Sequence, residues 1–145
     1  MSARPSPDPP PPHTRVATAL RVMLLVDGGM FLYAALLNFG MRIPLGITEL
    51  GFPVPIWQAG LGEAVIGLLL ISAAVTQRGA VAWLALGLSV AGIAFGLRSS
   101  QVQGPAREIH VLLVPLALLV FALLAWRQRE LDGRPSEPPD KTPEA

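Results

Sequence analysis

Six polar residues could bind a polar ligand or handle protons, and two of them are acids inside long apolar runs. Glu63 is the only charged residue between Gln58 and Thr76, a stretch that reads QAGLGEAVIGLLLISAAVT. An ionised carboxylate is costly in apolar surroundings unless it is paired, so such an acid marks either a buried pair or a functional site. The six candidates are Asp27, Asn38, Glu63, Arg98, Arg107 and His110.

These residues do not form a recognisable metal, haem or catalytic motif. The sequence has no cysteine, which excludes thiolate ligands and disulfides. Asp27, Glu63 and His110 are far apart in the chain, and no two of them have the spacing typical of metal ligands. There is also no phosphate-binding loop and no Ser-His-Asp arrangement with local support. The residues therefore favour a chain that is not an enzyme on its own.

The composition predicts an all-α integral membrane protein. Hydrophobic residues make up 52% of the 145 residues and charged residues only 14%. The usual charged share is about 25%. The few charges lie at the two ends of the chain and in short gaps between apolar runs. We therefore predict a bundle of four transmembrane helices, in contact with the lipid bilayer and with no nucleic-acid partner.

The apolar runs predict helices over residues 16–38, 57–75, 80–97 and 108–126, each close to the ~20 residues that cross a bilayer. Together they form one domain over residues 16–126. Residues 1–15 are Pro-rich and residues 127–145 are charged and Pro-rich, so both segments are predicted to be disordered tails. The Gly- and Pro-rich segment 39–56 cannot be a spanning helix, and we expect an interfacial loop with a short helical turn that caps the bundle.

Two glycines, Gly92 and Gly96, have the GxxxG spacing that allows helices to approach closely in lipid. Packing within the monomer is the favoured interpretation, and a homo-oligomer contact is the alternative.

The distribution of basic residues predicts the orientation. With four spans, both termini lie on the same side as the turn at Arg78, and that side carries most of the positive charge. The positive-inside rule therefore places both termini in the cytoplasm. Because arginine dominates over lysine and Ala, Gly and Pro are abundant, we expect a bacterial inner membrane. The basic residues of the cytoplasmic side are Arg4, Arg15, Arg21, Arg78, Arg127, Arg129, Arg134 and Lys141; those of the other side are Arg42, Arg98 and Arg107.

Helix geometry then places most of the candidates in the outer half of the bundle. At 1.5 Å per residue, Glu63 lies about 9 Å and His110 about 5 Å below the outer ends of their helices. Asp27 lies deeper, near the level of Ser89. Glu63 and His110 could handle protons or bind a polar head group, with Asn38, Arg98 and Arg107 nearby. The alternative is a structural ion pair between Glu63 and either arginine.

Two stretches, LRVMLLVDGGMFLYAALLNF and ELGFPVPIWQAGLGEAVIGLLLISAAVTQRGA, resemble the DoxX-like group of small four-helix bacterial membrane proteins. The resemblance covers about residues 17–126 and includes a Gly-apolar-Pro loop, a glutamate early in the second helix and a Thr-x-Arg turn. Asn38 departs from the pattern, since many relatives carry lysine there, and Asp27 is not part of it. The matching positions are Gly51, Pro53, Glu63, Gly67, Thr76 and Arg78.

Some DoxX-like proteins are subunits of thiosulfate:quinone oxidoreductase, and others are linked to membrane redox complexes. The resemblance therefore implies a non-catalytic subunit, or a partner that binds a quinone-like lipophile, in a redox-linked assembly. The quinone would be the cofactor, held together with a partner subunit. The residues leave two alternatives open: an oligomeric proton-coupled carrier that uses Asp27 and Glu63, or an anchoring factor whose Pro-rich tails recruit soluble partners.

Overall fold

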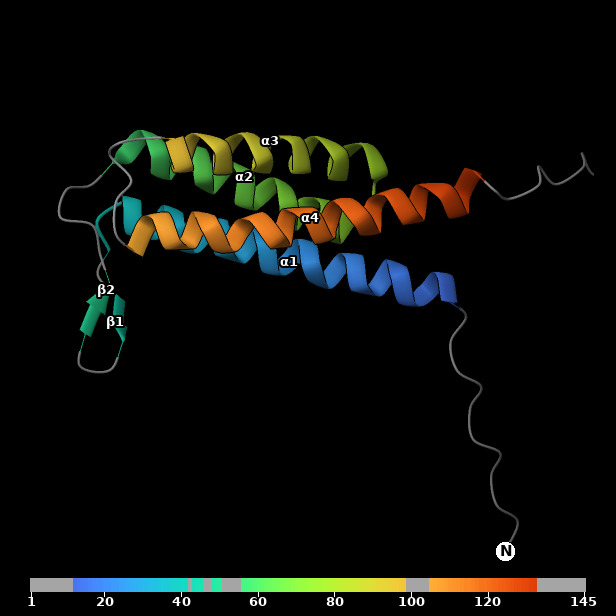
Figure 1. The fold of residues 1–145 in the computed structure, drawn as a ribbon, viewed down its shortest axis with the longest axis horizontal. Helices are drawn as coiled ribbons and strands as arrows, with labels where there is room; N and C mark the ends of the chain where they lie inside the picture. The colour runs from blue at the N-terminus through green and yellow to red at the C-terminus, as the bar shows by residue number, and fades with distance from the viewer. Residues whose placement is uncertain (1–11, 42, 46–47, 51–55, 99–104, 133–145) are drawn as a thin grey trace, which may run out of the picture.

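The computed structural model shows four helices packed side by side in a bundle, with a small β-hairpin at one end (Figure 1). It describes residues 12–41, 43–45, 48–50, 56–98 and 105–132. Each of the four helices is long and apolar enough to cross a membrane, so by length and composition the chain is a multi-pass membrane protein. The elements are α1 (Pro12–Asn38), β1 (Ile43–Leu45), β2 (Thr48–Leu50), α2 (Trp57–Thr76), α3 (Gly79–Arg98) and α4 (Pro105–Asp132).

All four helices extend beyond their predicted bounds, α2 and α3 by one residue at an end and α1 and α4 by more. Helix α1 already begins at Pro12, a residue that suits the first turn because its missing N–H would have no partner there. Helix α4 continues past Trp126 to Asp132. Side chains one turn apart stabilise this extension: Trp126 Nε1 donates to Glu130 Oε1 at 3.0 Å, and Gln128 Nε2 donates to Asp132 Oδ1 at 3.2 Å. The remainder of the two predicted tails lies outside the described residues.

Between the first two helices, where we expected a short helical turn, the described residues form two short β-strands. Strands β1 and β2 pair antiparallel, with Pro44 opposite Glu49. Proline is tolerated because both strands of a two-stranded sheet are edges. Gly40, with φ of 85°, turns the chain out of α1 just before the hairpin. Figure 1 shows the hairpin projecting away from the bundle and not covering its end; residues 51–55 lie outside the described part of the chain.

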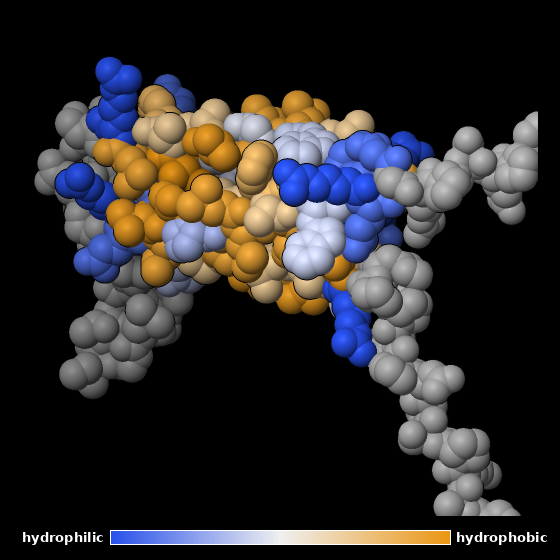
Figure 2. Space-filling view, turned by 45° about the vertical axis from the view of Figure 1, so that its right-hand side comes forward, coloured by the Kyte–Doolittle hydropathy of each residue, from blue (hydrophilic) through white to orange (hydrophobic). Residues whose placement is uncertain are grey.

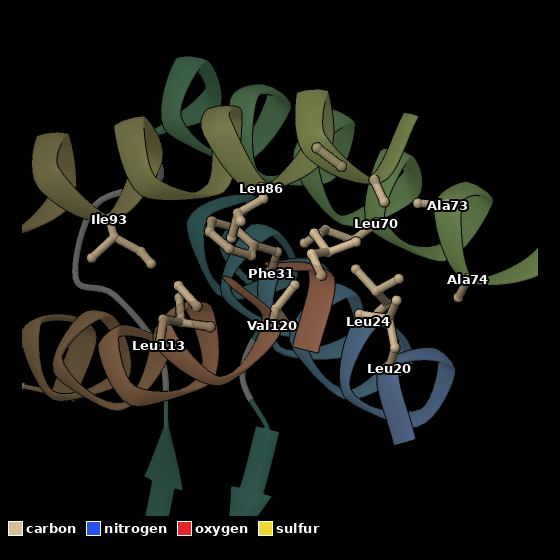
Figure 3. Close-up of a cluster of buried hydrophobic side chains, with 14 of the residues drawn as sticks. Leu20, Leu24, Phe31, Leu70, Ala73, Ala74, Leu86, Ile93, Leu113 and Val120 are labelled. Atoms are coloured by element: carbon tan, nitrogen blue, oxygen red, sulfur yellow. The ribbon is translucent and has the colours of Figure 1, made fainter. Parts of the chain in front are cut away.

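The helices pack in a closed ring, in which α1 contacts α2 and α4 while α3 contacts these same two helices. Large apolar side chains fill the centre, among them Phe31, Leu70, Leu113 and Val120 (Figure 3). Other apolar side chains point outward and form a band between the polar ends of the bundle (Figure 2). Since lipid tails are as apolar as the core, close packing and polar contacts must hold these helices together.

Glycines set the distance between the helices at two places. A Cβ atom on Gly28 would lie 2.9 Å from the Gly67 carbonyl oxygen, and one on Gly67 would lie 2.8 Å from the Gly28 carbonyl oxygen. Helices α1 and α2 therefore touch backbone to backbone. On α3, a Cβ on Gly92 would lie 2.8 Å from Ile66 Cδ1, and Gly96 faces His110. Both glycines of the GxxxG motif thus pack within the monomer.

We predict that Gly28→Ala destabilises the bundle, because a methyl group must displace the α2 backbone. Overpacking of this kind costs about 1–3 kcal/mol. Gly29 is the matched control, since a Cβ there meets nothing within 4 Å. Gly29→Ala should be neutral or should stabilise by up to about 1 kcal/mol through helix propensity. Thermal unfolding in detergent measures both variants, and equal midpoints would contradict the close contact.

Candidate functional site

Three of the candidate residues meet at the end of the bundle where α1 ends. Asn38 Nδ2 donates a hydrogen bond to Glu63 Oε2 at 2.6 Å, and His110 Nε2 lies 3.4 Å from Glu63 Oε1. All three residues are almost fully buried, with 4%, 6% and 4% of their surface exposed. Both carboxylate oxygens of Glu63 therefore have polar contacts, from α1 on one side and from α4 on the other. We call this the Asn38–Glu63–His110 cluster.

The end of α1 and the start of α2 hold Asn38 and Glu63 together. The Ile56 N–H, directly before α2, donates to the Asn38 carbonyl oxygen at 2.9 Å. The rings of Phe39 and Trp57 pack with their centroids 5.3 Å apart. Gly60 then lets α2 lie against Phe39, because a Cβ there would be only 2.7 Å from the Phe39 ring. This local packing brings Glu63 to the level of Asn38.

Helix α3 closes the cluster with its backbone. Gly96 faces the imidazole of His110 so closely that a Cβ at position 96 would overlap the ring. His110 therefore lies between the Glu63 carboxyl group and the α3 backbone. The sequence motif indicated close helix packing at Gly96, but it did not indicate that the packing partner would be a candidate functional side chain.

The cluster can move a proton without changing its total charge. An ionised Glu63 next to a protonated His110 and a neutral Glu63 next to a neutral His110 both give zero net charge. The Asn38 amide can donate to Glu63 in either state. This arrangement can hold one proton and pass it between two atoms.

The two arginines do not join the cluster. Both Arg98 and Arg107 have exposed side chains at the ends of α3 and α4. Among the described residues, the polar contacts of Glu63 are with Asn38 and His110, and neither arginine contacts it. Sequence spacing placed the arginines at the correct end of the bundle, but a long flexible side chain can equally reach toward the headgroups.

The sixth candidate, Asp27, forms a separate buried site with Ser89 of α3. Ser89 Oγ donates to Asp27 Oδ2 at 3.5 Å, and both side chains are 0% exposed. The expectation that Asp27 lies level with Ser89 is therefore confirmed. Asp27 Oδ1 is buried and has no hydrogen-bond partner within the described part of the chain. This site lies about 16 Å along α1 from Asn38.

An apolar groove between α3 and α4 was not predicted. It has a volume of about 430 Å³ and ends at Leu97 and Val114, which are next to Gly96 and one turn from His110 respectively. The groove therefore runs toward the Asn38–Glu63–His110 cluster. Apolar residues that face lipid and apolar residues that line a groove look alike in a sequence, so no signal could have identified it. Other lining residues are Leu86, Ile93, Ala117 and Phe121.

Comparisons with protein-family models, with curated proteins and with solved structures found no match. The resemblance to DoxX-like proteins therefore stays a prediction. Within the described ranges, no group of three His, Cys, Asp or Glu side chains is placed to hold a metal ion.

We predict that Asn38→Leu destabilises the protein by about 1–3 kcal/mol, because Glu63 loses its shortest hydrogen bond while it stays buried. Gln58→Leu is the control, since Gln58 is exposed near the start of α2. Exposed substitutions of this kind usually change stability by about 0.5 kcal/mol or less. Chemical unfolding in detergent compares the two, and a loss no larger in Asn38→Leu than in the control would show that the bond does not stabilise the bundle.

Proposed function

We propose that this chain is a non-catalytic membrane subunit that binds a quinone-like lipophile in a redox-linked assembly of a bacterial inner membrane, with both termini in the cytoplasm. The observation that carries the proposal is an apolar groove that ends beside a buried cluster of hydrogen-bonding groups. A quinone has complementary chemistry, because its ring and tail are apolar and its carbonyl oxygens accept hydrogen bonds. The resemblance to DoxX-like proteins supports the same class of ligand.

The groove has a suitable size and lining for the apolar part of such a ligand. Small-molecule sites are usually about 300–1,000 Å³ and mostly apolar, and this groove of about 430 Å³ lies within that range. Apolar walls alone cannot distinguish the ligand from a lipid tail, because both are equally apolar. Selectivity must therefore come from the polar groups at the end of the groove.

His110 is the group best placed to select a carbonyl oxygen. It lies one turn from Val114 at the end of the groove, and Gly96 places no side chain between the α3 backbone and the imidazole. A small separation of α3 from α4 at this point would open the imidazole to a head group. Glu63, itself held by Asn38, would keep the His110 imidazole in place and would give a proton to it or take one from it. The quinone would provide the redox chemistry, and a partner subunit would exchange electrons with it.

We predict that filling the groove weakens ligand binding. Ala94 lines the groove, whereas Ala91 is an exposed residue of the same helix outside it. A short-chain ubiquinone analogue should bind the purified protein at least about tenfold more weakly after Ala94→Trp, a loss of about 1.4 kcal/mol. Ala91→Trp should bind as the wild type does. Glu63→Gln should also weaken binding, because it alters the proton shared with His110.

Fluorescence or calorimetric titration in detergent measures the three variants. The proposal is wrong if the wild-type protein retains no quinone from its own membrane and binds no analogue, or if Ala91→Trp weakens binding as much as Ala94→Trp does.

A second function, proton-coupled transport by an oligomer, is favoured by Asp27 alone. Its Oδ1 atom is fully buried without a described partner, and an acid in mid-membrane usually faces a proton pathway or a substrate. Phe31, Leu113 and Val120 fill the centre of the bundle, so a pathway would have to form between protomers. The third alternative, an anchoring factor, depends mainly on tail residues that lie outside the described part of the chain.

If the chain carries protons, Asp27→Asn should abolish the flux. The amide keeps the shape of the side chain but cannot take up a proton at neutral pH. Asp132→Asn is the control, because Asp132 is exposed at the end of α4. Proteoliposomes with an internal pH dye measure the flux. Equal flux in wild type and Asp27→Asn, or no flux in the wild type, rules out this function.

A further inference from the structure

The end of the bundle opposite the Asn38–Glu63–His110 cluster carries a second polar site, formed by residues from three parts of the chain. A narrow cleft there is lined by Arg21 of α1, by Gln77 of the turn between α2 and α3, and by Arg127 of α4. Its other walls are mostly small apolar side chains, including Ala73 and Ala82. The fold thus brings two arginines and a glutamine to one cleft.

We propose that this cleft binds the phosphate group of an anionic phospholipid. Guanidinium groups bind phosphate oxygens through paired hydrogen bonds in addition to charge. The side-chain amide of Gln77 adds a neutral donor, and Gln77 is exposed at the turn. Its backbone N–H donates to the Ala73 carbonyl oxygen at 2.9 Å, which fixes the position of the residue. The cleft holds only about 10 Å³, so the phosphate would lie at its mouth, between Arg21 and Arg127.

The carboxylates described at this end of the bundle do not pair with these arginines. Two described acids lie at this end of α4, and each accepts a hydrogen bond from its own helix: Glu130 from Trp126 and Asp132 from Gln128. Neither Arg21 nor Arg127 pairs with an acid among the described residues. The described residues at this end therefore carry an excess of positive charge, which comes from Arg15, Arg21, Arg78, Arg127 and Arg129.

Two tryptophans indicate that the site lies at the depth of lipid headgroups. Trp126 precedes Arg127 and is exposed, and Trp83 packs its edge against Phe121 with ring centroids 5.7 Å apart. Tryptophan is enriched where the bilayer meets water. In Figure 2 the polar residues at this end adjoin the apolar band of the bundle. A lipid whose phosphate lies at the arginines would place its tails along that band, which favours a lipid over a dissolved anion.

The test compares lipid retention by four forms of the full chain in nanodiscs of equal parts phosphatidylglycerol and phosphatidylcholine. Native mass spectrometry counts the lipids that stay bound. The wild type should retain more phosphatidylglycerol than phosphatidylcholine. In the double variant Arg21→Gln/Arg127→Gln, the ratio of retained phosphatidylglycerol to phosphatidylcholine should fall at least about fivefold. Arg98→Gln/Arg107→Gln removes two exposed arginines at the other end and should leave it unchanged. Arg21→Lys/Arg127→Lys should keep part of it, because the charge remains.

Helix content and thermal unfolding must be the same in all four forms. A preference that survives Arg21→Gln/Arg127→Gln, or that falls equally in Arg98→Gln/Arg107→Gln, would overturn the proposal. A final arm adds inorganic phosphate to lipid-free protein in detergent. Phosphate that binds more tightly than phosphatidylglycerol would assign the cleft to a dissolved anion and would also overturn the lipid site. None of these outcomes depends on quinone binding.

Discussion

The backbone contact between Gly28 and Gly67 is the constraint on which the rest of the bundle depends. Inside a membrane, apolar surface gains little by leaving lipid, so helices associate where their shapes allow close approach. Each glycine would place a Cβ within 3 Å of the other's carbonyl oxygen, at 2.9 and 2.8 Å. Glu63 is one turn from Gly67 on α2, so the same contact fixes how near its carboxyl group comes to α1. The 2.6 Å hydrogen bond from Asn38 to Glu63 requires that spacing.

The two buried acids differ in how many polar contacts compensate for the burial of their carboxyl groups. Glu63 has contacts to both oxygens and can share a proton with His110, so its site is nearly complete within one chain. Asp27 has one long contact to Ser89 and a second oxygen without a described partner. A complete polar site is compatible with a structural role as well as with ligand binding. An incomplete one calls for something further, such as a bound proton, water or ligand.

The sequence was sufficient to predict the four helices. Within lipid, a long apolar run must satisfy its backbone hydrogen bonds internally, and an α-helix does this within one segment. The sequence also predicted that Asn38, Glu63 and His110 would lie together, since depth along each helix follows from residue number. It did not predict which side chains touch. Arg98 and Arg107 lie at the correct end of the bundle, but they are exposed and do not contact Glu63, because the rotation of a helix about its axis decides which side chains meet. The hairpin at 43–50 was missed because its apolar strand residues also suit an interfacial helix.

Helix α3 contacts both buried polar sites and also lines the apolar groove. It supplies Ser89 to Asp27, the Gly96 backbone to His110, and one wall of the apolar groove. Among the described residues, its polar contact to α1 is the 3.5 Å bond from Ser89, whereas α1 and α2 share a short hydrogen bond and a glycine contact. A separation of α3 from α4, which the proposed ligand would require, would widen the groove and uncover His110. The two buried polar sites are therefore both bounded by α3, although about 16 Å of helix separates them.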